Sequence, residues 1–173
     1  MNYGFVRIAT DIPGVKVGDC KYNTQKLSIT AYTCGDLFAQ QLLLDEAEMC
    51  LISILDFTRS LDIISIIGLP VAYHGTLLNC AAVIQKGKIL GLIPKTYLPN
   101  YKEFYEQRWF TSGDVHGNSN VLICGQMVPL SRHLVFNTPS CCFGVDICED
   151  VWAHIPLSSE LVIQGDEIIF NLR

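Results

Sequence analysis

The chain has 173 residues, 50% of them hydrophobic and 17% charged, and this balance is typical of a folded domain rather than of a disordered segment. Its length corresponds to about one domain, so residues 1–173 are treated as one unit. Twelve Lys and Arg against seventeen Asp and Glu give a formal net charge of −5. An acidic chain of this kind is expected to bind neither nucleic acid nor a charged membrane surface.

The apolar runs are too short for a membrane-spanning helix, which needs about 18 or more apolar residues. The longest runs, residues 63–73 and 89–94, contain or end in Gly and Pro. Residues 1–7 lack the pattern of a secretory signal. The eight Cys lie mostly in apolar runs, with no C-x-x-C pair and no zinc-type spacing to the four His. We therefore expect a cytoplasmic protein with reduced thiols and no metal site.

In chain order, residues 5–9 form a short β-prone run, and residues 18–23 look like the approach to a helix that is almost absent. Residues 36–60 contain few breakers and predict a helix. Residues at 3.6-residue spacing give this helix one apolar face: Ala47, Leu51, Ile54, Leu55 and Thr58. The β-branched run 62–68, bounded by Gly68 and Pro70, is typical of a strand covered on both faces.

Residues 78–85 and 88–93 predict two strands joined by Lys86-Gly87, a connection of hairpin length. Residues 97–113 predict a long loop with a helical turn. Three further strands are predicted at residues 134–136, 143–148 and 167–172. Strands and helices in this order indicate the α/β (α+β) class, with a mixed sheet covered by helices.

Cys148 ends a predicted strand and is followed at once by the polar segment that begins with Glu149. A nucleophile on such a sharp turn is exposed, and the next amide N–H can point at an oxyanion. From these residues alone, the simpler interpretation is a core cysteine beside a helix whose N-cap is Asp150.

Lys95 is a lone lysine that closes an apolar strand and begins an aromatic loop. A cation beside a thiol favours the thiolate and stabilises negative charge in acyl transfer; an ordinary strand-end lysine would instead reach solvent. In the loop, residues 101–110 mix aromatic and charged side chains that could line a polar pocket, where a carboxylate could hold an amine. Lys102, Glu103 and Gln107 are interpreted as solvated surface residues.

Five strings carry a more specific signal, and they follow one another in this order: Tyr32-Thr33-Cys34-Gly35-Asp36-Leu37-Phe38, Pro94-Lys95-Thr96-Tyr97-Leu98-Pro99-Asn100-Tyr101, Glu103-Phe104-Tyr105-Glu106, Arg108-Trp109-Phe110 and Gly144-Val145-Asp146-Ile147-Cys148-Glu149-Asp150-Val151-Trp152. Together they resemble the N-terminal glutaminase domain of bacterial glutamine-dependent NAD synthetase, a branch of the nitrilase (carbon-nitrogen hydrolase) superfamily. The resemblance runs from about residue 2 to residue 172.

This resemblance implies a nitrilase-type α-β-β-α sandwich with mixed sheets. It assigns Cys148 to attack on the glutamine side-chain amide, which gives a thioester, ammonia and, after hydrolysis, glutamate. It assigns Lys95 and the Glu149 N–H to the oxyanion, and Glu106 to the support of Lys95. It also implies four contacts to glutamine, from Tyr32, Tyr101, Phe104 and Glu149.

In the family, the ammonia passes to a separate ATP-using domain that amidates deamido-NAD, and members form homo-oligomers. The sequence ends at Arg173, so the synthetase domain is expected to be absent, together with its ATP and deamido-NAD sites. No cofactor is expected in this chain. Its expected partners are glutamine, a further copy of itself and, in the full-length enzyme, the synthetase domain.

The sequence departs from the family between Lys26 and Leu27. The family has a helix and a strand before the Tyr32 string, and that strand ends in a Pro-Glu-Leu-Ser string whose Glu is the general base. Here both elements are missing, an apparent deletion of roughly twenty residues, and Lys26 stands where the Glu belongs. We predict an incomplete sandwich and severely reduced turnover.

Two alternatives remain at this point. One is a non-catalytic fragment or pseudoenzyme that associates with a partner. The other is a general nitrilase-type amidase, against which the aromatic loop 97–110 argues.

Overall fold

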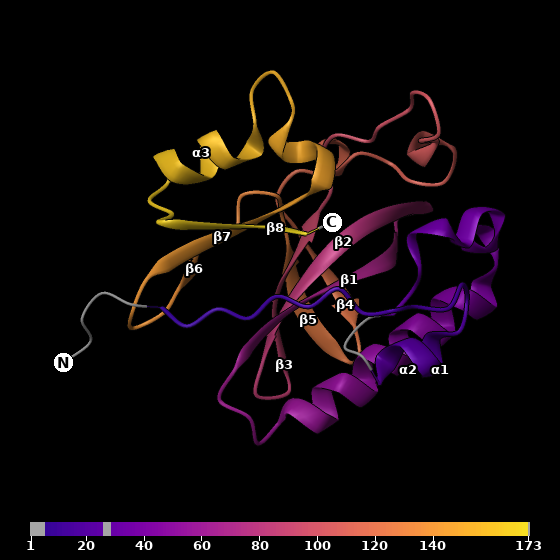
Figure 1. Cartoon of the computed structure of the whole chain (residues 1–173), viewed down its shortest axis with the longest axis horizontal. Coiled ribbons are helices and arrows are strands. Elements are labelled where there is room, and N and C mark those ends of the chain that lie inside the picture. The colour runs from indigo at the N-terminus through magenta and orange to yellow at the C-terminus, as the bar shows by residue number, and fades with distance from the viewer. Residues whose placement is uncertain (1–5, 26–28, 173) are drawn as a thin grey trace.

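Two β-sheets form the centre of the structure, a computed structural model that describes residues 6–25 and 29–172 (Figure 1). The larger sheet has the order β1-β2-β3-β5-β4. Its strands are β1 Ile64–Tyr73, β2 Thr76–Gln85, β3 Lys88–Pro94, β4 Ser119–Ile123 and β5 Gln126–Leu130. The smaller sheet has the order β6-β7-β8, with β6 Phe136–Asn137, β7 Cys142–Ile147 and β8 Ile168–Leu172. Both sheets are mixed, because β3 pairs with β5 and β7 with β8 in parallel.

Helices lie on the outer face of each sheet. Helices α1 (Cys20–Thr24) and α2 (Gln41–Thr58) lie on the side of the larger sheet, and α3 (Leu157–Ile163) packs on β7 (Figure 1). Residues 6–25 and 29–172 also contain four 3-10 helices: η1 Tyr32–Ala39, η2 Glu106–Arg108, η3 Gly113–Val115 and η4 Cys148–Val151. The layers therefore follow the order α-β-β-α, as the family resemblance implied.

Strand β2 shows why these layers form. Side chains alternate between the two faces of a strand, and every residue of β2 from Cys80 to Ile84 is buried. Cys80, Ala82 and Ile84 face a core shared with α2, whereas Ala81 and Val83 face a second core shared with β7. An apolar run without polar alternation thus places β2 in the middle of the sandwich.

The predicted helix and hairpin are both present. All five predicted apolar-face residues of α2 are buried. The helix begins at Gln41 instead of 36 because Gly35, at φ 57°, has non-helical geometry and Gln40 is extended. In the hairpin, Gln85 pairs with Lys88, and both Lys86 (φ 49°) and Gly87 (φ 74°) are left-handed, as a type I′ turn requires.

Other predictions were wrong in detail. Residues 6–9 are exposed and belong to no strand, and within the described residues neither sheet includes them; residue 5 is outside the described residues. Strand β1 continues through Pro70 to Tyr73. This is possible because β1 is an edge strand, where a residue without an N–H need not cost the sheet a hydrogen bond. Gly68 and Ala72 are exposed, so β1 is not covered on both faces along its whole length.

The sequence analysis missed the turn of the β1–β2 hairpin at His74-Gly75, the β4–β5 hairpin and helix α3. Strand β7 also ends at Ile147, one residue earlier than predicted. No helix in residues 6–25 and 29–172 is long and apolar enough to cross a membrane.

Candidate active site

Cys148 lies at the point where β7 ends and η4 begins. Its backbone has φ 47°, a left-handed conformation that is unfavourable for a residue with a Cβ. Its side chain is partly exposed and packs against the core between the two sheets. Both features are those expected of a side chain presented on a strained turn. Asp150 does not act as the N-cap of a following helix, so that interpretation was wrong.

Asp150 instead connects the ends of two strands from different sheets. Its carboxylate is fully buried and accepts hydrogen bonds from the N–H groups of Ile147 (3.2 Å), Thr96 (3.1 Å) and Tyr97 (2.7 Å). Burial raises the pKa of Asp150 to about 6, although these hydrogen bonds and the charge of Lys95 oppose the shift. The carboxylate thereby fixes the end of β7, next to Cys148, against the segment that follows Lys95.

Lys95 does not reach solvent. Its side chain and that of Glu106 are each 1% exposed, and Lys95 Nζ lies 2.7 Å from Glu106 Oε1. The Lys95 backbone N–H donates to Asn79 O (2.8 Å), which holds this residue at the end of the sheet. Within the part of the chain that the structure describes, Glu106 Oε2 has no hydrogen-bond partner. The structure therefore brings the two residues together as an ion pair.

A cavity of about 720 Å³ is lined by the segment 96–101, residues 110–112, Gln107 and Glu149. Lys95, Glu106 and Cys148 are not among its lining residues, although each is next in sequence to one that is. The Tyr101 hydroxyl donates to Glu149 Oε1 (3.0 Å), and this hydrogen bond raises the pKa of Tyr101. The ring of Phe104 packs edge-on against Tyr101, with centroids 5.8 Å apart. Tyr101, Phe104 and Glu149 are thus neighbours, and their contact with glutamine stays a prediction.

The other candidate residues have different positions. Lys102 and Glu103 are exposed, as predicted, whereas the exposed Gln107 also lines the cavity and donates to Leu98 O (3.3 Å). Tyr32 belongs to η1, and its side chain is not described. Lys26 lies outside the described residues.

Two polar contacts near the site were not assigned from the sequence. Asp36 accepts hydrogen bonds from Arg108 Nε (2.9 Å) and Trp109 Nε1 (3.0 Å), which ties η1 to the loop of Glu106. The sequence signal for this contact was that Asp36 lies in one of the five strings, and Arg108 and Trp109 in another. The second contact joins Asp146 and Asn171, whose side chains lie 2.7 Å apart. No local pattern marks this pair, because parallel strands bring the two residues together.

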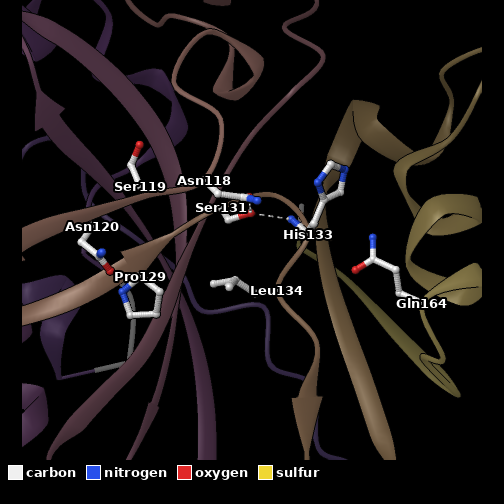
Figure 2. A pocket seen from close by; sticks show the side chains of 8 residues that line it. All are labelled: Asn118, Ser119, Asn120, Pro129, Ser131, His133, Leu134 and Gln164. Atoms are coloured by element: carbon white, nitrogen blue, oxygen red, sulfur yellow. Dashed lines mark hydrogen bonds between the residues drawn. The ribbon is translucent and has the colours of Figure 1, made fainter.

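A second cavity, of about 460 Å³, lies between β4, β5 and the end of α3, and contains none of the predicted site residues. Its lining is largely neutral and polar, and Figure 2 shows Ser131 between Asn118 and His133, with Gln164 on the opposite side. Among the described residues, no group of three or more His, Cys, Asp or Glu side chains could hold a metal ion.

Comparisons with known proteins agree with this geometry. No family model matches the chain. The "Glutamine-dependent NAD(+) synthetase" of Mycobacterium tuberculosis H37Rv is 30% identical to it over 98% of this chain and 28% of that protein. A structure of the corresponding protein from Acinetobacter baumannii, solved in complex with ADP, superposes with a TM-score of 0.70 and 25% identity, over 90% of this chain and 30% of the other. A carbon-nitrogen hydrolase from Helicobacter pylori has a TM-score of 0.55 and 20% identity, over 79% and 40% of the two chains.

The layered sheets and the comparison with the Helicobacter pylori protein define a carbon-nitrogen hydrolase fold. More specifically, the chain is a homologue of part of the glutamine-dependent NAD synthetases, and it spans under a third of the length of those relatives. The alignment with the Mycobacterium tuberculosis protein extends over 193 residues, 20 more than the 173 of this chain. The relative therefore has residues in the aligned region without a counterpart here.

Proposed function

We propose that this chain carries the glutamine-hydrolysing site of a glutamine-dependent NAD synthetase. Cys148 Sγ forms a bond to the side-chain amide carbon of glutamine, and the C–N bond then breaks to release ammonia. Water hydrolyses the resulting thioester to glutamate and the free thiol. Lys95 and the Glu149 N–H stabilise the negative oxygen formed in each step, and Glu106 holds Lys95 in place.

One observation carries this proposal. Lys95 and Glu106 form a fully buried ion pair at the end of β3, and Asp150 joins the residue after Lys95 to the end of β7, where the strained turn at Cys148 begins. A buried ion pair is costly to desolvate, and it contributes little stability compared with apolar residues of similar size. Its connection through Asp150 to the turn at Cys148, and its place next to the segment 96–101 that lines the cavity, therefore favour a chemical role. Tyr101, Phe104, Glu149 and the segment that contains Tyr32 are the proposed glutamine contacts.

We further propose that the chain is impaired in turnover, because the general base of the family is missing at Lys26. In the complete enzyme, ammonia would pass to an ATP-using domain that amidates deamido-NAD, and the subunits would assemble as homo-oligomers. The site residues here need no cofactor of their own. A non-catalytic fragment that associates with a partner, or a general nitrilase-type amidase, are the alternatives.

The test uses a glutamine analogue in which a chloroketone replaces the side-chain amide. The protein is incubated with this probe, its intact mass is measured, and the modified peptide is mapped. We expect a single adduct on Cys148, formed at least about tenfold more slowly when glutamine saturates the pocket, since the two compounds compete for one site. Cys148→Ser should remain unlabelled, and Cys142→Ser, which changes another partly exposed thiol, should label normally.

The same preparations distinguish the alternatives. If all eight Cys react slowly and alike, the chain is a non-catalytic remnant. If simple amides block labelling of Cys148 as well as glutamine does, it is a general amidase. Ammonia release from glutamine should be close to that of Cys148→Ser, and release at an ordinary enzymatic rate would show that the base is not needed or not missing. A starting mass above that of the 173 residues would show that the base is not missing.

A further inference from the structure

Asn171 lies next to the proposed nucleophile, although nothing above gives it a role. It stands on β8, directly opposite Asp146 on the parallel neighbour β7. Its Nδ2 donates to Asp146 Oδ1 (2.7 Å) and also to the carbonyl oxygen of Cys148 (3.3 Å). Because both partners are acceptors, only the NH₂ side of the amide can face them, and this fixes the orientation of the Asn171 side chain.

Burial of the Asp146 carboxylate is energetically unfavourable, so a functional reason for this residue is expected. Its side chain is fully buried, and within the described residues its Oδ2 has no hydrogen-bond partner. The side-chain hydrogen bond that Asp146 accepts comes from Asn171. A buried carboxylate with so little compensation costs free energy, but it holds the Asn171 amide firmly toward the Cys148 carbonyl.

The carbonyl of Cys148 and the N–H of Glu149 belong to one peptide unit. That unit is planar and trans, so the two groups point in opposite directions, and a contact that holds the carbonyl also directs the N–H. Cys148 itself has a left-handed φ, which is unfavourable for a residue with a Cβ and persists only where surrounding contacts support it.

We propose that Asn171, held by Asp146, is a positioning residue that sets the direction of the Glu149 N–H toward the oxyanion. The inference rests on the proposed function, because it assigns a partner to the oxyanion donor of the same site. Asn171 touches neither substrate nor reacting atoms; it acts through the Cys148–Glu149 peptide.

The experiment compares two thiol reagents on the same variants. The chloroketone analogue of glutamine passes through a tetrahedral oxyanion, whereas iodoacetamide alkylates a thiol by direct displacement and needs no oxyanion donor. Asn171→Asp removes the donor and places two carboxylates together. We expect it to slow labelling of Cys148 by the chloroketone about tenfold or more, less than the full loss of an oxyanion donor, and to change the iodoacetamide rate by less than about threefold.

Two further variants complete the test. Asp146→Asn keeps an oxygen acceptor for Asn171, so its chloroketone rate should stay within about threefold of the unchanged chain. The matched control is Asn120→Asp, an exposed strand position on β4, which should label at the normal rate. If Asn171→Asp does not fold, Asn171→Ala is judged by the same ratio of rates.

An unchanged chloroketone rate in a folded Asn171 variant overturns the proposal, as does an equal slowing with both reagents. Neither result touches the proposed function as long as the unchanged chain is labelled selectively at Cys148. If that selectivity is missing, the proposed function itself fails.

Discussion

At the scale of residues, the buried ion pair of Lys95 and Glu106 should have the largest effect on the free energy of unfolding. Each side chain is 1% exposed, so removing one partner leaves the other charge buried and unpaired. We expect Lys95→Met to lower the free energy of unfolding by about 3–5 kcal/mol, and the double variant with Glu106→Leu to recover much of that loss. Urea unfolding measures both.

Lys86→Met is the matched control for this prediction. Lys86 pairs with Asp62 at 2.9 Å, but both side chains are more than half exposed. The control should change the free energy of unfolding by no more than about 1 kcal/mol. Equal losses for Lys86→Met and Lys95→Met would contradict the buried ion pair.

At the scale of elements, the hairpin between β2 and β3 depends on the backbone of Gly87. With φ 74°, a Cβ at this position would be strained, and it would also lie 2.6 Å from Arg59 Cγ and 3.2 Å from the Leu55 carbonyl. We predict that Gly87→Ala lowers the free energy of unfolding by about 1–2 kcal/mol. Gly68→Ala on β1 meets nothing within 4 Å and should be neutral or slightly stabilising. Urea midpoints that fail to separate the two variants would refute the prediction.

Three hairpins among the described residues share one turn pattern, although only the turn between β2 and β3 was predicted. His74 (φ 48°) and Gly75 (φ 76°) join β1 to β2 in the same way as Lys86 and Gly87 join β2 to β3. Cys124 (φ 50°) and Gly125 (φ 70°) repeat the geometry of Lys86 and Gly87. The missed signal was a residue followed by Gly between short alternating runs, with Val121 and Ile123 before it and Val128 and Leu130 after it. Each strand has only five residues, so the turn residues were the stronger signal of this hairpin.

At the scale of the whole molecule, Asp150 joins the two sheets, and its titration should influence global stability. Its pKa rises from 3.8 to about 6 on folding because the carboxyl is buried. The folded state therefore holds the proton more tightly, so this group lowers the free energy of unfolding as pH rises through the interval from about 4 to about 6. Above that interval its effect is constant.

The comparison with Asp150→Asn isolates this group, because the raised pKa values of Asp146 and Asp166 are then common to both proteins. Relative to the variant, the unchanged chain should lose up to about 3 kcal/mol between pH 4 and pH 7. Urea unfolding at several pH values measures the difference. A difference that grows in favour of the unchanged chain with rising pH would mean that the hydrogen bonds outweigh burial.

The sequence by itself determined the main elements, the mixed α/β class and the set of candidate residues, whereas the layer order came from the family resemblance of the five strings. Continuous apolar runs predicted β2 and β3, helical spacing predicted the buried face of α2, and the five strings indicated Cys148, Lys95 and Glu106. These signals are local, since they depend on side chains that share one strand, one helix face or one motif. The comparisons then confirmed the relationship that the strings had suggested.

Only the tertiary structure decided which of these residues meet. The Lys95–Glu106 ion pair, the three N–H groups around Asp150 and the contact of Asn171 with Cys148 all join parts of the chain that local patterns cannot relate. Residues 6–9 show the reverse case, because a β-prone run forms a strand only when another strand supplies its hydrogen-bond partners. Burial and pairing are properties of the packed molecule, so the energetics of the site follow from the fold and not from the motif.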